Sequence, residues 1–155
     1  MPDTVIADTS CLIALTKTDT LPLLHRLYHK VIITGEIAAE FGEPLPEWIE
    51  IKQVGNKKYL QLLEATLDKG EASAIALAIE LENALPVIDD LKGRKEAKRL
   101  GLKITGTLGV LFSAKQKGFI PALKPCLDKL QAVNFRISPQ IVEELLVLSK
   151  ENSII

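Results

Sequence analysis

The sequence has no long apolar run, few cysteines and almost no net charge, and each absence excludes a class of protein. No apolar stretch approaches the roughly 20 residues that a membrane-spanning helix needs. The only cysteines, Cys11 and Cys126, lack ligand-like spacing, so we expect buried reduced thiols rather than a disulfide. The formal net charge is −1, so the overall charge gives no indication of nucleic-acid binding.

The amino terminus also lacks the features of an export signal. No basic leader precedes an apolar segment, and "MPDTV" is typical of the approach to a first strand. We therefore expect a cytoplasmic location and no attachment to a membrane. The chain has 155 residues, of which 47% are hydrophobic and 25% charged, which favours a single globular domain over residues 1–155.

Short apolar strand patterns alternate with helical patterns along the chain. Strands that alternate with helices indicate βαβ units, and hence a mostly parallel sheet covered by helices on both faces. The expected strands are 4–7, 30–34, 48–54, 85–89 and 102–105, with a possible last strand at 134–138. The expected helices are 10–17, 21–28, 35–41, 56–68, 71–83, 94–100, 107–117 and 122–132, followed by a final helix that starts at Pro139 with Ser138 as its cap.

Acidic residues stand where several of these strands end. Asp8 follows the first strand and separates two apolar segments, where an unpaired carboxylate would be costly to bury. Asp89 and Asp90 close the strand that starts at Leu85, and Thr107 follows the next strand. Because ligands of parallel α/β sheets bind beyond the carboxyl ends of the strands, we expect these side chains at one edge.

Two glutamates are expected to join this edge. Glu40 lies near the end of the helical segment 35–41, and Glu71 opens a later helix. Clustered carboxylates repel one another and raise one another's pKa unless a cation neutralises them. Carboxylate oxygens suit Mg²⁺ or Mn²⁺, and such ions can activate water for phosphodiester cleavage. The acids therefore predict a divalent metal site with hydrolytic chemistry.

Each acid also has a purely structural explanation. Asp8 could cap a helix, although the hydroxyl residues beside it offer the same service. Glu71 is favoured by the helix dipole, Glu40 would ordinarily be solvated, and the pair Asp89 and Asp90 could begin a turn. The metal-site interpretation therefore depends on several acids meeting at one edge.

A basic segment follows the acidic pair. Its cations either hold the phosphate backbone of RNA beside the metal site or form a solvated helix face. The glycine-rich "ITGTLG" lacks both the dinucleotide-binding order and a Walker lysine, so it indicates a strand-to-helix turn. The basic residues are Lys92, Arg94, Lys95, Lys98, Arg99 and Lys103.

These motifs together resemble the PIN-domain family, and within it the VapC-type toxin ribonucleases. The resemblance runs from "DTS" at 8–10, through Glu40 and "GEASAIALA" at 70–78, to "VIDDLKGRKEAKRLGLKITGTLG" at 87–109. It covers nearly the whole chain. It implies a three-layer α/β/α sandwich with a mostly parallel, roughly five-stranded sheet. It also implies an endoribonuclease that depends on Mg²⁺ or Mn²⁺.

The resemblance further implies a role for each site residue. Ser10 would steady Asp8 or a metal-bound water, and Thr107 would support the rim. The expected partners are an RNA substrate, an antitoxin protein and a second copy in a homodimer, and Lys92, Arg94, Lys95 and Lys98 would bind the RNA. The implied catalytic acids and metal ligands are Asp8, Glu40, Glu71 and Asp90, with Asp89 a further candidate ligand because the register of the acidic pair is ambiguous.

Two other functions stay open on the sequence alone. A PIN domain that has lost its catalysis would act as a protein- or RNA-binding module, although all four acid positions are filled here. A phosphohydrolase of the haloacid-dehalogenase type also has an aspartate after its first strand. That chemistry needs a second aspartate two residues later, where this chain has Ser10.

Overall fold

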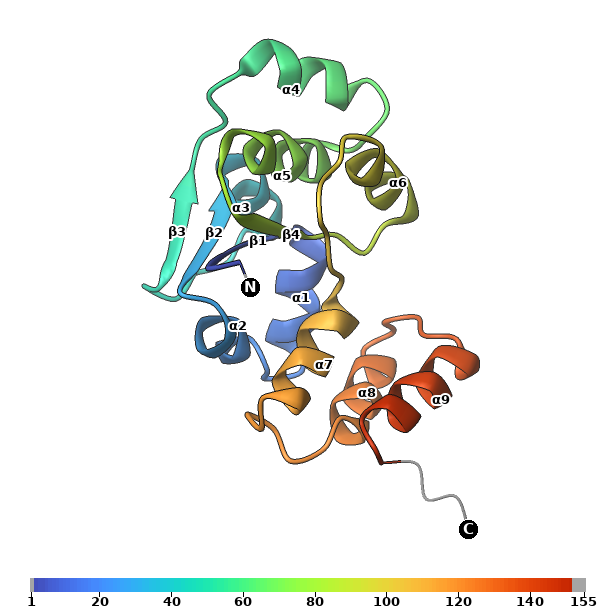
Figure 1. Cartoon of the computed structure of the whole chain (residues 1–155). Coiled ribbons are helices and arrows are strands. Elements are labelled where there is room, and N and C mark those ends of the chain that lie inside the picture. Colours follow the sequence, from blue (N-terminus) through green and yellow to red (C-terminus); the bar gives the residue numbers. More distant parts are fainter. Residues whose placement is uncertain (1, 152–155) are drawn as a thin grey trace.

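The computed structural model describes residues 2–151, and a parallel sheet forms its centre. The strand order is β3-β2-β1-β4, and every neighbouring pair is parallel (Figure 1). The order therefore reverses beside β1, which is where such sheets bind their ligands. The strands are β1 (Thr4–Ala7), β2 (Lys30–Thr34), β3 (Ile49–Lys52) and β4 (Ala84–Val87).

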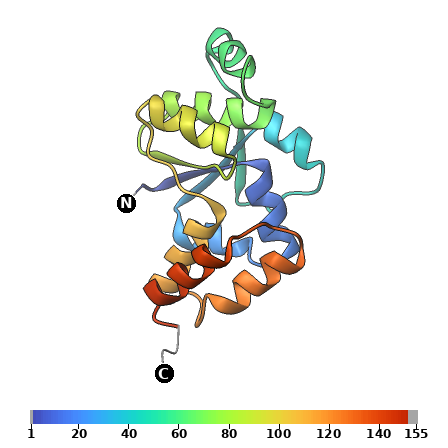
Figure 2. The same cartoon turned by 90° about the vertical axis from the view of Figure 1, so that its right-hand side faces the viewer.

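Helices cover both faces of this sheet. Helix α5 packs against β1, β2 and β4 on one face, and α1, α2 and α7 lie on the other (Figures 1 and 2). Helix α4 lies outside α5, and α8 and α9 form a pair beyond α7 (Figure 1). The helices are α1 (Thr9–Lys17), α2 (Pro22–Leu27), α3 (Gly35–Phe41), α4 (Lys57–Glu64), α5 (Lys69–Glu80), α6 (Leu91–Arg99), α7 (Thr107–Gln116), α8 (Lys124–Ala132) and α9 (Pro139–Leu148).

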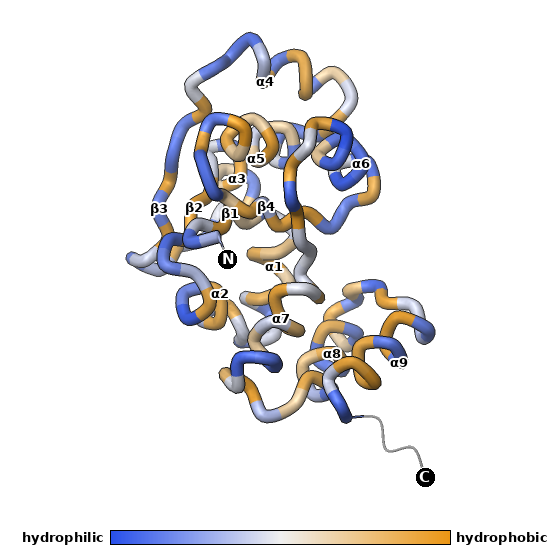
Figure 3. Tube along the Cα trace, in the orientation of Figure 1, coloured by the Kyte–Doolittle hydropathy of each residue, from blue (hydrophilic) through white to orange (hydrophobic). Residues whose placement is uncertain are grey.

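Burial explains why these segments take these positions. Helix α5 is buried from Gly70 to Ala78, and its small side chains let it lie close to the sheet. Helix α6 is mostly hydrophilic along its length, whereas α5 and the central strands are mainly hydrophobic (Figure 3). Helix α6 therefore packs against α5 with one face and turns the other to solvent.

The expected fold class is confirmed, but the sheet has four strands rather than roughly five. Segment 102–105 adds only one bridge, between Thr105 and Val87. Thr105 donates to Pro86 O at 3.1 Å and accepts from Ile88 N at 2.8 Å. The next bond of this ladder would need an N–H on Pro86, and proline has none. The segment therefore meets the sheet only at Thr105, and no strand forms.

The possible strand at 134–138 is also wrong. Asn134 has a left-handed backbone with φ 67°, and Phe135 N bonds back to Leu130 O at 2.9 Å. The chain therefore turns tightly at the end of α8 and continues as a linker to α9. The expected start of that helix is confirmed, because Ser138 Oγ accepts from Ile141 N at 3.2 Å. No helix among the described residues is long and apolar enough to cross a membrane.

Candidate active site

A cavity of about 210 Å³ lies beyond the carboxyl ends of β1 and β4, and acids form most of its wall. We call it the acid pocket. The four acids that the sequence predicts to share a site all line it, although they come from four separate segments of the chain. The lining residues are Asp8, Thr9, Ser10, Glu40, Asp68, Glu71 and Asp90.

Backbone groups at helix starts hold three of these acids. Asp8 Oδ1 accepts from the backbone N of Cys11 in the first turn of α1 at 2.8 Å. Asp68 Oδ1 accepts from the backbone N of Glu71 at the start of α5 at 2.9 Å, and Asp90 Oδ2 accepts from the backbone N of Lys92 at the start of α6 at 3.0 Å. The cap of α1 is thus Asp8 itself and not one of the hydroxyl residues beside it. Each cap bond uses one carboxylate oxygen. The positive ends of three helix dipoles therefore face the acid pocket.

Asp8 is buried, with 3% of its surface exposed. Burial, followed by the negative charge of Asp89, raises the pKa of Asp8 to about 7. The cap bond from α1 opposes this shift but does not cancel it. Near neutral pH, Asp8 therefore needs either a proton or a cation beside it.

Glu71 is the second buried acid of the pocket. It is 8% exposed, and its Oε2 atom is buried without a hydrogen-bond partner among the described residues. Burial, followed by the charges of Asp68 and Asp90, raises the pKa of Glu71 to about 8. Ionised carboxylates accept hydrogen bonds but cannot donate them, so these acids approach one another favourably only around a shared proton or a cation.

Glu40 enters the pocket from α3. Thr9 Oγ1 donates to Glu40 Oε1 at 3.0 Å, and this bond links the start of α1 to the end of α3. Gly70 on α5 lies so close to the same oxygen that a Cβ there would overlap it. The exposed Glu40 side chain therefore has a defined position without burial.

Glycines also make room for two other carboxylates. A Cβ at Gly93 would lie 2.9 Å from Glu71 Oε2, and one at Gly106 would lie 2.8 Å from Asp89 Oδ1. Real Cβ atoms essentially never approach a neighbour this closely. The glycines of the "DDLKGR" and "ITGTLG" segments thus leave space for acids rather than cradle a phosphate.

The two neighbouring aspartates have different positions. Asp90 lines the acid pocket, whereas Asp89 turns towards the start of α7. Thr107 donates to Asp89 twice, from its backbone N at 2.8 Å and from its hydroxyl at 2.5 Å. Both Asp89 oxygens are therefore engaged, and Thr107 contacts the site through Asp89.

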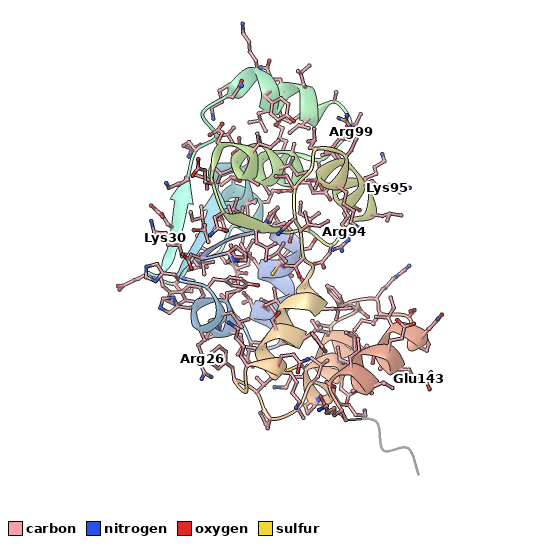
Figure 4. The ribbon with its side chains drawn as sticks, in the orientation of Figure 1. Arg26, Lys30, Arg94, Lys95, Arg99 and Glu143 are labelled. Carbon is pink, nitrogen blue, oxygen red and sulfur yellow. The ribbon has the colours of Figure 1, made fainter. Side chains whose placement is uncertain are left out.

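The basic residues of α6 lie outside the acid pocket. Arg94 is half-buried, donates to Ile88 O at 2.8 Å and points into the region between α6 and α7 (Figure 4). Lys92, Lys95 and Lys98 are exposed, and Lys95 extends to the outer side of α6 (Figure 4). Only Arg94 among these four lies against the site.

The family model DUF3368, described as a PIN domain, matches residues 4–151. The chain belongs to the PIN-domain family. PIN domains are generally nucleases and typically use divalent metal ions. None of the curated proteins compared matches the sequence significantly.

The acids of this PIN domain fit a divalent ion that keeps part of its water shell. Within residues 2–151, no three His, Cys, Asp or Glu side chains converge closely enough to form a complete cage. Mg²⁺ commonly binds through one or two carboxylates, with waters and substrate phosphates as its other ligands. The unpartnered Glu71 oxygen and the neighbouring Asp8 and Asp90 offer carboxylates of that kind.

The sequence analysis missed two residues of this PIN-domain site, Thr9 and Asp68. Asp68 stands three residues before Glu71, and this spacing places a cap residue and a first-turn acid at the same end of one helix. That pattern was visible in "DKGE" and could have added Asp68 to the predicted acids. The contact of Thr9 with Glu40 spans 31 positions and has no local signal.

Proposed function

We propose that this PIN domain is an endoribonuclease of the VapC type, dependent on Mg²⁺ or Mn²⁺, and the toxin of a toxin–antitoxin pair. The observation that carries the proposal is the buried, unpartnered Glu71 oxygen inside a cavity walled by other acids. A buried polar atom without a protein partner is costly, and a bound ion or an ordered water is the usual compensation. A divalent cation would remove that cost.

The roles of the residues follow from their positions. Glu71, with Asp8 and Asp90 beside it, would hold the cation directly or through the waters that the ion keeps. Glu40 lies at the open side of the pocket in its bond with Thr9. A bound divalent ion supplies Lewis-acid stabilisation of the charge that develops on the phosphate during hydrolysis. The exposed Ser10 hydroxyl lies where substrate enters, and the cations of α6 attract the RNA backbone.

The proposal is tested by RNA cleavage with Mn²⁺ for the wild type and Asp8→Asn. Asparagine caps a helix as well as aspartate does, so the fold and α1 should persist. We expect the rate to fall by at least about a hundredfold, because the ion loses a charged ligand. Asp128→Asn is the matched control, since Asp128 is exposed on α8 and pairs with Lys124 at 3.1 Å. Equal rates for wild type and Asp8→Asn would contradict the proposal.

The biological role needs separate measurements. Growth arrest on expression of the wild type, and not of Asp8→Asn, supports the toxin assignment. RNA cleavage without growth arrest contradicts the toxin assignment but not the proposed nuclease function. If calorimetry detects no Mn²⁺ binding by the wild type and no RNA is cut, the chain is a binding module instead. Light scattering tests the expected homodimer, and co-purification with the protein of an adjacent gene tests the antitoxin.

A further inference from the structure

Two larger hollows continue from the acid pocket towards the C-terminal helices. The first, of about 890 Å³, shares Ser10 and Asp90 with the acid pocket. The second, of about 700 Å³, shares Asn134, Phe135 and Arg136 with the first. We call these two hollows together the side groove. Because neighbouring hollows share wall residues, the acid pocket and the two hollows adjoin one another in this order and define a path along this side of the molecule.

The charge of the walls changes along this path. Among the residues that the structure describes, the wall of the acid pocket has carboxylates and no cation. In the side groove, the guanidinium groups of Arg94 and Arg136 accompany Asp89 and Asp90, so cations first enter the walls there. Arg136 is exposed and forms no ion pair within residues 2–151. An elongated polyanion matches this order, since its phosphates contact the arginines while one phosphate meets the cation of the acid pocket.

An aromatic side chain lies in the middle of the side groove. Phe135 is half-buried and lines both hollows. The left-handed turn at Asn134 and the bond from Phe135 N to Leu130 O hold its backbone in place. Aromatic rings that line a cationic groove stack on the bases of single-stranded nucleic acids. In a duplex the bases are already stacked and their faces are unavailable.

We propose that the side groove binds a single-stranded segment of RNA next to the phosphate that is cut, with a base on Phe135 and a phosphate on Arg136. The proposal rests on the proposed nuclease function and assigns the side groove, through Phe135 and Arg136, as the place where the strand is held. Phe135 and Arg136 are then positioning residues that hold the strand while the acids act on it. They lie about 45 positions after the last acid of the pocket in the sequence, on the linker between α8 and α9.

The test is binding of a fluorescein-labelled single-stranded oligoadenylate, followed by anisotropy, with full-length Asp8→Asn as the uncleaving background. Adding Phe135→Leu should weaken binding at least about fivefold through lost stacking. Adding Arg136→Gln should weaken binding and reduce the slope of log K against log salt by about 0.7, since one phosphate contact is lost. The same oligoadenylate annealed to a complementary oligouridylate of equal length, which leaves no base unpaired, should bind more weakly than the single strand.

The matched control is Arg26→Gln. Arg26 is also an exposed arginine, but it lies on α2, with its guanidinium 4.3 Å from the Phe119 ring and far from Arg94 (Figure 4). This change should leave affinity and salt slope unaltered. Arg136 is exposed, so Arg136→Gln keeps the proposal testable if Phe135→Leu lowers the melting temperature.

Hydrogen exchange distinguishes RNA from the other molecules that could occupy the side groove. Protection of residues 134–138 by the oligoadenylate supports the proposal. Protection that instead grows with protein concentration alone assigns the side groove to a second copy of this chain and overturns it, as does protection only by a protein partner. Unchanged affinity in both double variants also overturns it, even where the wild type cuts RNA. If binding depends on Phe135 and Arg136 but the wild type cuts no RNA, the proposed nuclease function is contradicted and the proposal for the side groove still holds.

Discussion

The acid pocket and the side groove meet at Ser10 and Asp90, but their side chains are held in different ways. In the acid pocket, backbone N–H groups at helix starts fix the carboxylates. In the side groove, Phe135 and Arg136 lie on a linker, which is held by the backbone bond of Phe135 to α8 and by the packing of Phe135 against the core. Fixed ligands suit one ion and one reacting phosphate, whereas a less constrained surface suits strands of varied sequence.

The acid pocket and the side groove should also respond to different solution conditions. The acid pocket places like charges together, and the raised pKa values of Asp8 and Glu71 show that the ionised form is disfavoured there. The side groove instead leaves a cation, Arg136, exposed to water. Protons and divalent ions should therefore act on the acid pocket, and salt should act mainly on the side groove.

The largest effect is expected from Gly93→Ala, which tests how rigid the acid pocket is. The added Cβ would lie 2.9 Å from both Glu71 Oε2 and Ile88 Cγ2, so Glu71 must move. We expect RNA cleavage with Mn²⁺ to fall about a hundredfold while far-UV circular dichroism stays unchanged, since alanine favours a helix. Gly55→Ala is the control, because its Cβ would crowd Glu80 at 3.2 Å, away from the pocket. A normal rate in Gly93→Ala would show that Glu71 tolerates displacement.

A smaller effect is expected from Thr107→Val, which removes the 2.5 Å hydroxyl bond to Asp89 and keeps the side-chain shape. Asp89 would retain its bond from the backbone N of residue 107, so we expect cleavage to fall only about tenfold. Initial rates at saturating Mn²⁺ measure this change. Thr66→Val, at an exposed position, should leave the rate unaltered. A loss as large as that of Asp8→Asn would make Asp89 a direct ligand.

Metal-free stability should depend on pH through the acid pocket. The pKa of Asp8 is about 7 and that of Glu71 about 8 in the folded protein, both above their unfolded values. Between about pH 4 and 8 the folded chain therefore binds more protons, and its free energy of unfolding falls as pH rises. We expect the melting temperature in EDTA to fall by several degrees from pH 5 to pH 8. Mn²⁺ should reverse the fall at pH 8.

Glu71→Gln is the matched variant for this experiment. It removes the titrating group, so its melting temperature in EDTA should vary less with pH than that of the wild type. Mn²⁺ should also stabilise it less, because one charged ligand is lost. Identical pH profiles for the variant and the wild type would contradict the assignment of the pH dependence to the acid pocket.

The contrast between the two regions also explains which parts could be predicted from the sequence. Asp8 follows β1 directly and Asp90 comes shortly after β4, and parallel strands place such positions at one edge, so local patterns predicted their neighbourhood. These patterns left open whether Asp89 or Asp90 lines the acid pocket. Phe135 was assigned to a possible strand at 134–138. Its actual position depends on a turn back to Leu130 and on the distant α6, neither of which has a local pattern.

The missing fifth strand has a similar cause. The pattern of residues 102–105 is typical of a strand, and the segment does reach the edge of the sheet. The obstacle is Pro86 on the neighbouring strand, which has no N–H to offer. Strand propensity describes one segment, whereas a ladder requires donors on both, so pairing could not be read from residues 102–105 alone.

The smallest effect is expected from Lys95→Ala, and it compares the outer face of α6 with the side groove. Lys95 is exposed and extends away from Arg94 (Figure 4), so any contact with an RNA phosphate there is screened by salt. We expect oligoadenylate affinity in the Asp8→Asn background to change by less than about twofold, as is typical of weak surface charge contacts. Arg136→Gln, measured beside it, should have the larger effect and the larger change in salt slope. If Lys95→Ala has the larger effect, the RNA crosses the outer face of α6 and the side groove is not its path.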